Sequence, residues 1–532
     1  MTIDLIIKNA NVLTLDENDT IARSVLVADG KIIKVCKESE PDTSGFNVGP
    51  NTREIDLNGA TLLPGFIDTH SHLLMYGEML DFIDCRSPEN ESITDIVQKV
   101  KAKAQHTPPG KWIMGWGYDD TLLAEKRHPM RDDLDQAAPD HPVFLRHISG
   151  HFAAVNSKAL EIASITEQTP DPEGGFFGRY EDGRLDGVVH EIPALQLVAP
   201  ALPKPTVEDL VEAIANGAKE YLAQGITTCT DAGVGLDKGA IELDAHLAAA
   251  QSGKNPLNMR LMILNHLFRE DGVLAGYTAE QTDEELQQKS NGRVRLDSAK
   301  HFQDGSIQGY TAALREPYYS KPDQIGELLN EQQAFNEEIA DLHNRGFRIA
   351  IHGNGDRAIG SNIEALSQAV QKYPRDDHRH RIEHVQTAST ADLRTMKQHG
   401  IAASFFINHV YYWGDRHRDI FLGPDRAERM NPLREAADLD LLFTLHSDCP
   451  ITPISPLFSV WAAVNRLTRN GHVLGESQKI DVVTALKSMT IYGAELNFEE
   501  NEKGTIEEGK QADFAILAQD PLTCPPEEIK DI

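Results

Sequence analysis

The stretch Pro64-Gly65-Phe66-Ile67-Asp68-Thr69-His70-Ser71-His72 contains the residues that decide the fold. Its apolar pair, Phe66 and Ile67, leads to a polar end at which two histidines alternate with a serine. Because side chains two apart on a β-strand point to the same face, His70 and His72 can direct two imidazoles at one point. Imidazole is the commonest protein ligand of zinc and suits several other divalent metals. A single His-X-His is more often surface or core histidine, so its meaning depends on further ligands elsewhere in the chain.

The composition is that of a large globular protein with an excess of negative charge. A chain of 532 residues predicts two or more domains, one of which could be a barrel of about 250 residues or more. The 51 basic and 82 acidic residues give a net charge of −31, which opposes binding to nucleic acid and to anionic membranes. A run of about 18 apolar residues, as a membrane span requires, is absent from the sequence. We therefore expect neither nucleic acid nor a membrane as a partner, and a homodimer is an open alternative to a monomer.

The N-terminal residues and the cysteines predict a cytoplasmic protein. Residues 1–15 lack a basic segment followed by an apolar one, because Asp4, Lys8 and Asn9 interrupt the apolar residues. The five cysteines are scattered, and none forms a Cys-X-X-Cys pair. This spacing argues against a disulfide framework and against a thiolate zinc site.

Both ends of the chain predict β structure. Near the start, Asp29-Gly30 separates two short apolar runs and is a strong signal for a two-residue hairpin. The tail becomes β-like again at 504–509 and 512–517. We therefore predict one small β-sandwich domain, formed from residues 1–60 together with 500–532.

The region between these ends predicts a barrel. From about residue 207 an amphipathic helix, a glycine and a short apolar strand recur in that order. A glycine just past a helix supplies a left-handed C-cap, and a parallel strand buried on both faces reads as a continuous apolar run. Repeated units of this kind favour a closed barrel over an open sheet. We predict an α/β protein with a (β/α)₈ TIM-like barrel over 61–499, in which an insertion at about 76–200 shapes the active site.

Polar residues follow the predicted barrel strands, at the end where active sites of such barrels lie. A lone histidine or aspartate in this position is most often structural, but several in one chain indicate one shared metal centre. The strand-end residues are His352 after 347–351, His384 after Ile382-Glu383, His446-Ser447-Asp448 after 441–445, and Lys300 after 294–296.

The residue types explain how such a centre could be built. The two histidines of the first strand and Asp448 can hold one divalent ion, and His352 and His384 can hold a second. Two ions about 3.5 to 4 Å apart need an anionic bridge and lower the pKa of a shared water. The ammonium of Lys300, with an ordinary pKa of about 10.4, would be repelled by them, whereas its carbamate could form the bridge. A lysine that is unmodified, at the surface or in an ion pair, is the alternative.

These motifs resemble the amidohydrolase superfamily and, within it, the family 3 branch of metal-dependent hydrolases that are N-substituted formamide deformylase-like. The resemblance covers nearly the whole chain. Its matching segments are 63–72, Ser149-Gly150-His151, 156–160, 300–306, 311–314, His352 with 355–358, 382–386, 447–450 and 504–513.

The resemblance implies roles for individual residues. It makes Asp448 the general base as well as a metal ligand, and it makes Lys300 a carboxylated bridge between one or two divalent ions, with zinc expected. His446 stands where many relatives have glycine. The implied metal ligands are His70, His72, Lys300, His352, His384 and Asp448.

The function implied by the resemblance is hydrolysis of a carbon–nitrogen bond in a small molecule, in an amide, N-formyl or N-acyl group, by a metal-bound hydroxide. A deaminase or a cyclic-amide hydrolase would use the same centre and is the alternative. A non-catalytic barrel predicts missing ligands, whereas all six ligand positions are filled. His151 is a candidate substrate contact or a structural histidine, and Trp413 is a candidate for an aromatic substrate pocket or simple packing beneath a loop.

Overall fold

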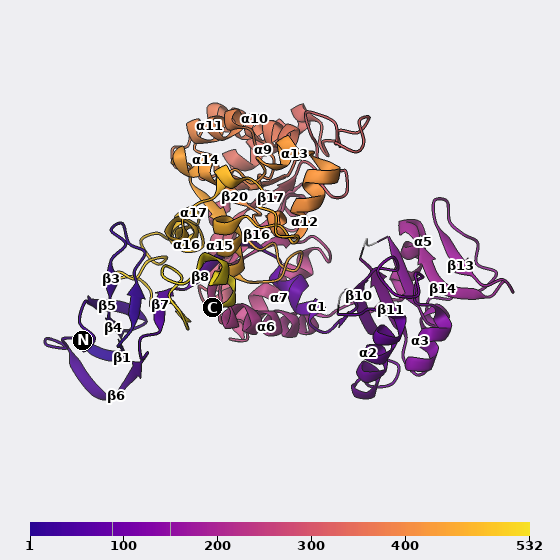
Figure 1. The fold of residues 1–532 in the computed structure, drawn as a ribbon, viewed down its shortest axis with the longest axis horizontal. Coiled ribbons are helices and arrows are strands. Elements are labelled where there is room, and N and C mark those ends of the chain that lie inside the picture. Colours follow the sequence, from indigo (N-terminus) through magenta and orange to yellow (C-terminus); the bar gives the residue numbers. More distant parts are fainter. Residues whose placement is uncertain (88, 149–150) are drawn as a thin grey trace. The chain divides into compact units, whose positions relative to one another are not determined.

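The computed structural model describes residues 1–87, 89–148 and 151–532. The chain forms two compact units (Figure 1). One consists of Met1–Tyr76 together with Ile214–Ile532, and the other is the continuous segment Gly77–Ala213. The second unit lies in the part of the chain where the sequence predicts an insertion.

The first unit contains a barrel of eight parallel strands, which confirms the predicted fold class. Neighbouring strands follow the order β21-β20-β19-β18-β17-β16-β15-β8. The two end strands meet, because the Oγ1 atoms of Thr69 and Thr444 lie 2.8 Å apart and the amide of Asp448 donates to the carbonyl oxygen of His70 at 3.1 Å. The strands are β8 (Phe66–Ser71), β15 (Ile226–Val234), β16 (Asn258–Leu264), β17 (Val294–Phe302), β18 (Ile349–Gly353), β19 (Arg381–His384), β20 (Ala402–Phe405) and β21 (Phe443–Leu445).

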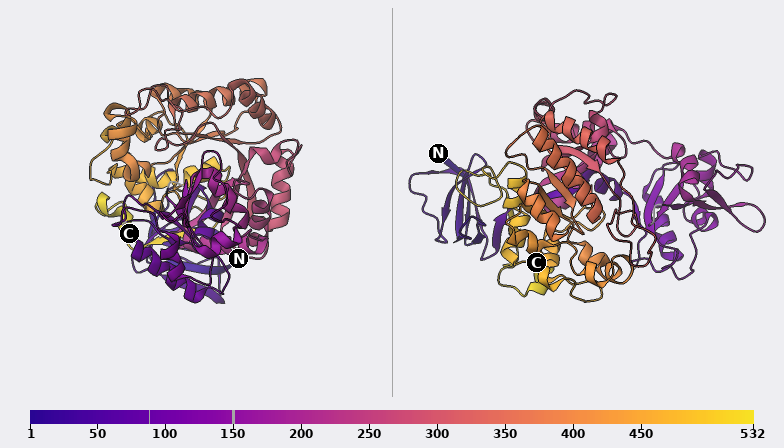
Figure 2. Two further views of the ribbon diagram at one scale, coloured as in Figure 1. Left: turned by 90° about the vertical axis from the view of Figure 1, so that its right-hand side faces the viewer. Right: turned by 90° about the horizontal axis from the view of Figure 1, so that it is seen from above.

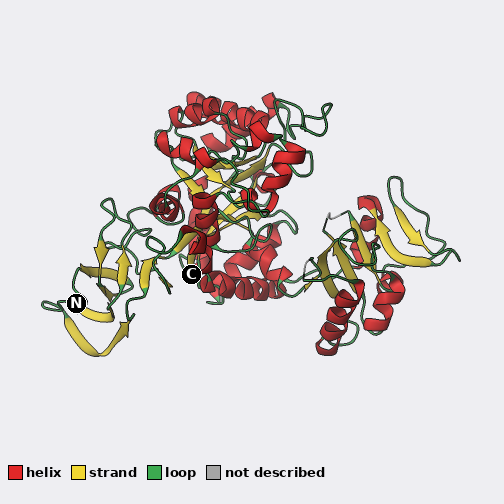
Figure 3. Cartoon of the chain, viewed as in Figure 1, coloured by secondary structure: helices red, strands yellow, loops and turns green. Residues whose placement is uncertain are grey.

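Helices surround these strands (Figures 2 and 3). Their ends carry the expected capping residues: α11, for example, begins with a capping box between Ser389 and Asp392. The helices of this unit are α6 (Val207–Ala223), α7 (Ala240–Gln251), α8 (Ala279–Ser290), α9 (Gln332–Asn344), α10 (Asp356–Lys372), α11 (Thr390–Gln398), α12 (His409–Arg416), α13 (Pro424–Ala427), α14 (Leu433–Asp438), α15 (Pro456–Asn465), α16 (Val482–Ser488) and α17 (Ile491–Leu496), and α1 (Leu73–Met79) runs up to the second unit.

Strand β17 is longer than the sequence predicts. The prediction ended it at 294–296, but it continues to Phe302, so that Lys300 lies within the strand and pairs with Ala350 of β18. The polar residues Asp297 and Lys300 made this part look like a loop, yet both are buried.

Two four-stranded sheets made largely from the N-terminal residues form the β part of this unit. One has the order β5-β4-β1-β6 and the other β22-β7-β2-β3, in which the C-terminal strand β22 pairs with β7. Strand β7 therefore belongs to this sheet, although the predicted boundary at residue 60 put it in the barrel. The strands are β1 (Thr2–Lys8), β2 (Asn11–Leu13), β3 (Ile21–Ala22), β4 (Ser24–Ala28), β5 (Lys31–Cys36), β6 (Asn47–Asp56), β7 (Thr61–Pro64) and β22 (Phe514–Leu517).

The C-terminal residues differ from the prediction at two places. Residues 504–509 form turns rather than a strand, and they reach the sheets through single backbone hydrogen bonds such as Ile506 N to Thr14 O at 2.9 Å. Beyond β22, the short 3₁₀-helix Pro526–Asp531 packs on α15, where the indole of Trp461 donates to the carbonyl oxygen of Glu527 at 3.0 Å. These last residues therefore cover the barrel instead of completing a β domain.

The second unit has a mixed six-stranded sheet of its own, in the order β13-β14-β12-β11-β10-β9. Buried apolar side chains from its strands and helices form two separate clusters, one around Ile96 and one around Phe177. The elements are β9 (Ile83–Asp84), β10 (Ile113–Tyr118), β11 (Val143–His147), β12 (Phe152–Val155), β13 (Phe176–Arg179), β14 (Leu185–His190), α2 (Ile93–His106), α3 (Arg131–Ala137), α4 (Ser157–Ile162) and α5 (Glu191–Val198). In the part of the chain that the structure describes, no helix is long and apolar enough to cross a membrane.

Candidate metal centre

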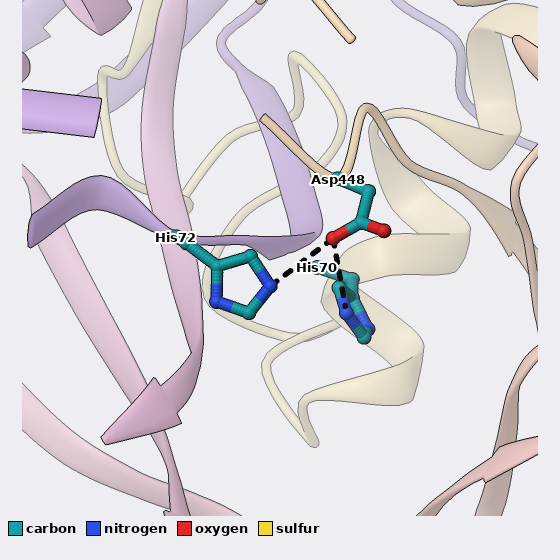
Figure 4. A group of neighbouring side chains, drawn as sticks. All are labelled: His70, His72 and Asp448. Atoms are coloured by element: carbon teal, nitrogen blue, oxygen red, sulfur yellow. Dashed lines mark ion pairs between the residues drawn. The ribbon is translucent and has the colours of Figure 1, made fainter. Parts of the chain in front are cut away.

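Three of the predicted ligands meet at the carboxyl end of β8. Nε2 of His72 lies 3.1 Å from Oδ1 of Asp448, and Nε2 of His70 lies 3.5 Å from the same oxygen (Figure 4). Ligand atoms of all three residues lie within 4.8 Å of one another. The strand alternation expected from the sequence therefore does direct both imidazoles at one carboxylate oxygen.

The other two predicted histidines lie beside this group. The rings of His352 and His384 are 4.5 Å apart, and the ring of His384 is 4.8 Å from that of His70. Nε2 of His352 is 3.1 Å from the carbonyl oxygen of Gly305. The ligand atoms of His70, His72 and Asp448 all lie within 4.8 Å of one another. Among the described residues, no third His, Cys, Asp or Glu forms such a set with His352 and His384. A dication held here would therefore need an anionic ligand of another kind.

Lys300 is buried in the same cluster without a hydrogen-bond partner. Its side chain is 1% exposed, and nothing in the described parts of the chain hydrogen-bonds to its Nζ. Burial lowers the pKa of Lys300 to about 8, although the charges of Glu383 and Asp448 act in the opposite direction. Leaving a buried polar atom without a partner is costly, so such an atom usually has a chemical role. The donor set of imidazoles, carboxylate and free amine fits a divalent ion.

The backbone is strained at two of the predicted ligands. His384 has φ of +71° and Asp448 has φ of +50°, both in the left-handed region that non-glycine residues rarely adopt. Each such residue costs about 1–3 kcal/mol and persists only where its surroundings enforce it. Both residues lie at or just after strand ends, where strained backbone is typical of functional positions.

Glu383 orients the first histidine. Its Oε2 lies 2.6 Å from Nδ1 of His70, and its Oε1 accepts from Nε of Arg381 at 2.5 Å. Arg381 in turn donates to Asp297 Oδ1 at 3.1 Å. With a carboxylate at Nδ1, His70 has only Nε2 left for a metal.

Asp68 supports the ends of the first and last strands. One oxygen of its carboxylate accepts from Ser447 Oγ at 2.6 Å and the other from the amide of His70 at 3.2 Å. Burial raises the pKa of Asp68 to about 7. These bonds tie the residue beside Asp448 to the strand that carries His70.

The electrostatics favour neutral imidazoles. Burial, together with the charge of Lys300, lowers the pKa of His70 well below its usual value and that of His352 to about 3. Burial and the neighbouring His352 lower the pKa of His384 in the same way. His72 is the exception: burial lowers its pKa, but the hydrogen bond to Asp448 and the charges of Asp448 and Asp231 together raise the pKa overall. Neutral imidazole is the form that binds a metal.

Trp413, a predicted substrate contact, ends an aromatic row that begins at the cluster. Phe406 lies 5.7 Å from the ring of His384 and 4.5 Å from His409, and His409 lies 4.3 Å from Trp413. The indole is half-buried on α12. Contact of Trp413 with a substrate stays a prediction.

His151, the other predicted substrate contact, belongs to the second unit. Its side chain is exposed, and its Nδ1 lies 2.9 Å from Oε2 of Glu191. Ser149 and Gly150 of the same motif lie outside the described residues. A role of His151 in substrate binding also stays a prediction.

The second unit holds another compact set of metal-type ligands, which the sequence did not single out. Asp119, Asp120 and His147 have ligand atoms within 4.8 Å of one another, and His147 Nε2 lies 3.1 Å from Asp120 Oδ1. Oδ1 of Asp119 already accepts from Thr121 Oγ1 at 2.6 Å. These contacts are those of an ordinary turn and an ion pair, so we propose no metal site at these three residues.

The sequence did not identify Glu383, Asp68 and His446 as site residues. A signal existed for Glu383: Arg381 and Glu383 alternate within a buried strand, and charges in such positions need partners. His446 follows a predicted strand and was noted there, but its role, like that of Asp68, depends on residues distant in sequence.

An eight-stranded parallel barrel with histidines and an aspartate gathered at its strand ends defines a metal-dependent hydrolase. A sequence model described as "Amidohydrolase family" matches residues 53–532, so the chain belongs to this family. This confirms the resemblance drawn from the motifs. It also confirms that the protein is an enzyme that hydrolyses carbon–nitrogen bonds.

Similar proteins agree with this membership. The chain is 28% identical to N-substituted formamide deformylase from Arthrobacter pascens, over 99% of this chain and 96% of that protein. It is 30% identical to protein LONG AFTER FAR-RED 3 from Arabidopsis thaliana, over 97% and 87% of the two chains. The structure of an uncharacterised metal-dependent hydrolase from Pyrococcus horikoshii matches with a TM-score of 0.77 and 23% identity, over 98% and 99% of the chains, and shares the fold.

Proposed function

We propose that this protein hydrolyses the carbon–nitrogen bond of an amide and that its preferred substrates are N-formyl or N-acyl amines. The cluster at the barrel strand ends is the proposed catalytic centre. The observation that carries the proposal is the convergence of His70 and His72 on one carboxylate oxygen of Asp448, in the same cluster as the buried, unpartnered amine of Lys300. The likeness to N-substituted formamide deformylase supports this substrate class.

His70, His72 and Asp448 would hold one divalent ion, for which we propose zinc, and His352 and His384 would hold a second. Bound there, a divalent ion supplies Lewis acidity, which polarises a carbonyl and acidifies water. The second pair consists of two neutral imidazoles, and among the described residues no anionic ligand completes a compact three-ligand set with it. We propose that Lys300 supplies it as a carbamate, formed when the neutral amine adds to carbon dioxide and releases a proton.

Asp448 is proposed as the proton carrier of the reaction. One of its oxygens, Oδ1, faces both histidines, which leaves Oδ2 to accept a proton from the attacking water and to return it to the leaving nitrogen.

The five cysteines are all free thiols, which fits the proposed cytoplasmic location.

Metal content is the first test. Protein purified without chelator should contain at least one equivalent of zinc or another divalent ion per chain. The same measurement on Asp120→Asn removes any contribution from the second acidic set, and the variant should keep the ions of the barrel. Less than one equivalent in both proteins would contradict the proposal.

Turnover of a substrate panel is the second test. We expect hydrolysis of N-formyl or N-acyl amines, whereas faster release of ammonia from an aminated heterocycle, or opening of a cyclic amide, would assign the alternative substrate classes. Asp448→Asn should lower kcat by at least about a hundredfold. The control Asp425→Asn, at an exposed position on α13, should leave turnover unchanged.

A further inference from the structure

A fifth histidine, His446, lies between the two proposed ligand pairs. It is fully buried just after β21. Its ring stacks on that of His70, with centroids 4.7 Å apart and 23° between the planes. Its Nε2 lies 3.1 Å from Nδ1 of His384, and its Nδ1 lies 2.8 Å from Oγ of Ser404. Both nitrogens of His446 are therefore occupied by protein partners.

The hydrogen bond between the two rings can form in two ways. If His384 carries its proton on Nδ1, it donates to Nε2 of His446, and a neutral His446 then donates from Nδ1 to Ser404. Nε2 of His384 is then a free lone pair. If His446 instead donates from Nε2, His384 carries its proton on Nε2 and cannot bind a metal through that atom.

Ser404 is suited to accept in the first arrangement. Thr444 Oγ1 lies 3.3 Å from Ser404 Oγ and 2.8 Å from Thr69 Oγ1, so the row continues to the strand that carries His70. A serine hydroxyl can accept from both His446 and Thr444, because its oxygen has two lone pairs. The row is buried from end to end.

We propose that His446 is a positioning residue. It accepts a hydrogen bond from the Nδ1–H group of His384 and thereby presents Nε2 of His384 to the second divalent ion. This inference rests on the proposed metal-dependent function. His446 itself binds no ion, since Nε2 and Nδ1 are both engaged. Residues that hold the second nitrogen of a metal-binding histidine commonly change metal affinity by about 10–100-fold when they are replaced.

The test compares three variants, each in the Asp120→Asn background so that only barrel ions are counted. His446→Phe keeps a flat ring against His70 but cannot accept from His384. His446→Gln restores an acceptor for His384 and a donor for Ser404. Ser404→Ala removes the distal partner with little change in volume. Thermal unfolding of the metal-free proteins reports whether each variant folds.

Metal-free protein is titrated with Zn²⁺ against a chromophoric chelator, and the visible spectrum is recorded with Co²⁺. We expect His446→Phe to keep the first ion, to bind the second about 10–100-fold more weakly and to change the Co²⁺ spectrum of that site. His446→Gln should recover most of the affinity, and Ser404→Ala should lose a smaller part.

Several outcomes would overturn the inference. These are wild-type affinity and spectrum in His446→Phe, equal loss in His446→Gln and His446→Phe, or a parent protein that binds one ion only. If His446→Phe does not fold, unchanged affinity of Ser404→Ala for the second ion overturns it. A parent protein that binds no ion contradicts the proposed function itself and is distinguished from these results.

Discussion

At the scale of single residues, the centre depends on a carboxylate that binds no metal in our proposal. Glu383 accepts from His70 and from Arg381, and all three side chains are buried. Removing its charge leaves the Arg381 guanidinium with Asp297 as its remaining acidic partner. A buried ion pair that loses one partner is strongly destabilising, because the other charge stays in a poorly solvated interior.

We therefore expect Glu383→Gln to lower the free energy of unfolding by about 3 kcal/mol and to weaken binding of the first ion by about 10–100-fold. Urea unfolding of the metal-free protein measures the first effect and chelator competition the second. Glu337→Gln, at an exposed position on α9, is the matched control and should change neither. Loss of stability without loss of metal affinity would show that Glu383 supports the fold alone.

The side chains gathered at the strand ends could be singled out from the sequence because each follows an apolar run within a few residues. Their partners could not: Glu383 reaches a histidine 313 residues away in sequence, and His446 reaches His384 from another strand. A hydrogen bond between side chains leaves no local pattern in the sequence, whereas alternation along a strand does.

At the scale of elements, a second group of histidines fixes the opposite, amino-terminal end of β19. His380 Nδ1 accepts from the amide of Ile349 at 3.0 Å, and its Nε2 donates to Nδ1 of His343 at 2.8 Å. His343 Nε2 donates to the carbonyl oxygen of Tyr373 at 2.8 Å, and His378 Nδ1 accepts from the amide of His380 at 3.0 Å. These bonds require neutral rings.

This group makes the protein sensitive to acid. Burial lowers the pKa of His343 and His378, and burial with the neighbouring His378 lowers the pKa of His380 well below 6.5. The unfolded chain binds these protons near pH 6.5 and the folded chain does not. Stability is therefore complete above pH 6.5 and falls as the pH drops below it, by up to about 1.4 kcal/mol per pH unit for each histidine.

Other buried histidines titrate in the same direction, so the contribution of His380 is measured by comparison. His380→Asn keeps an acceptor for Ile349 but cannot take up a proton. We expect it to be less stable than wild type at pH 8 and to lose less stability between pH 6.5 and pH 5 in urea unfolding. His106→Asn, at the exposed end of α2, should run parallel to wild type. Equal pH dependence of His380→Asn and wild type would contradict this account.

At the scale of the whole molecule, the segment Gly77–Ala213 is inserted between two helices that touch. A Cβ added to Gly77 of α1 would lie 2.0 Å from the carbonyl oxygen of Ala213 in α6. Such close approach allows only glycine and fixes where the chain leaves and returns. The sequence indicated the insertion because a long excursion separates the first barrel strand from the αβ rhythm, which begins at about residue 207. It did not predict the six-stranded sheet, since short strands of mixed direction have no regular period.

Because α1 and α6 already meet, the barrel should form without most of the insertion. The start of α6 lies six residues before Ala213, or about 9 Å along the helix, and a flexible linker of six residues spans about 13 Å. We expect a chain in which residues 81–205 are replaced by such a Gly/Ser linker to fold cooperatively and to keep the metal content of the full-length Asp120→Asn protein. If the insertion shapes substrate access, as the sequence predicts, the shortened enzyme should discriminate less among N-acyl substrates. Thermal unfolding, metal analysis and kcat/KM across the substrate panel measure these three properties. An unfolded or metal-free product would show that the inserted unit is part of the barrel's own stability, and unchanged discrimination would remove it from substrate selection.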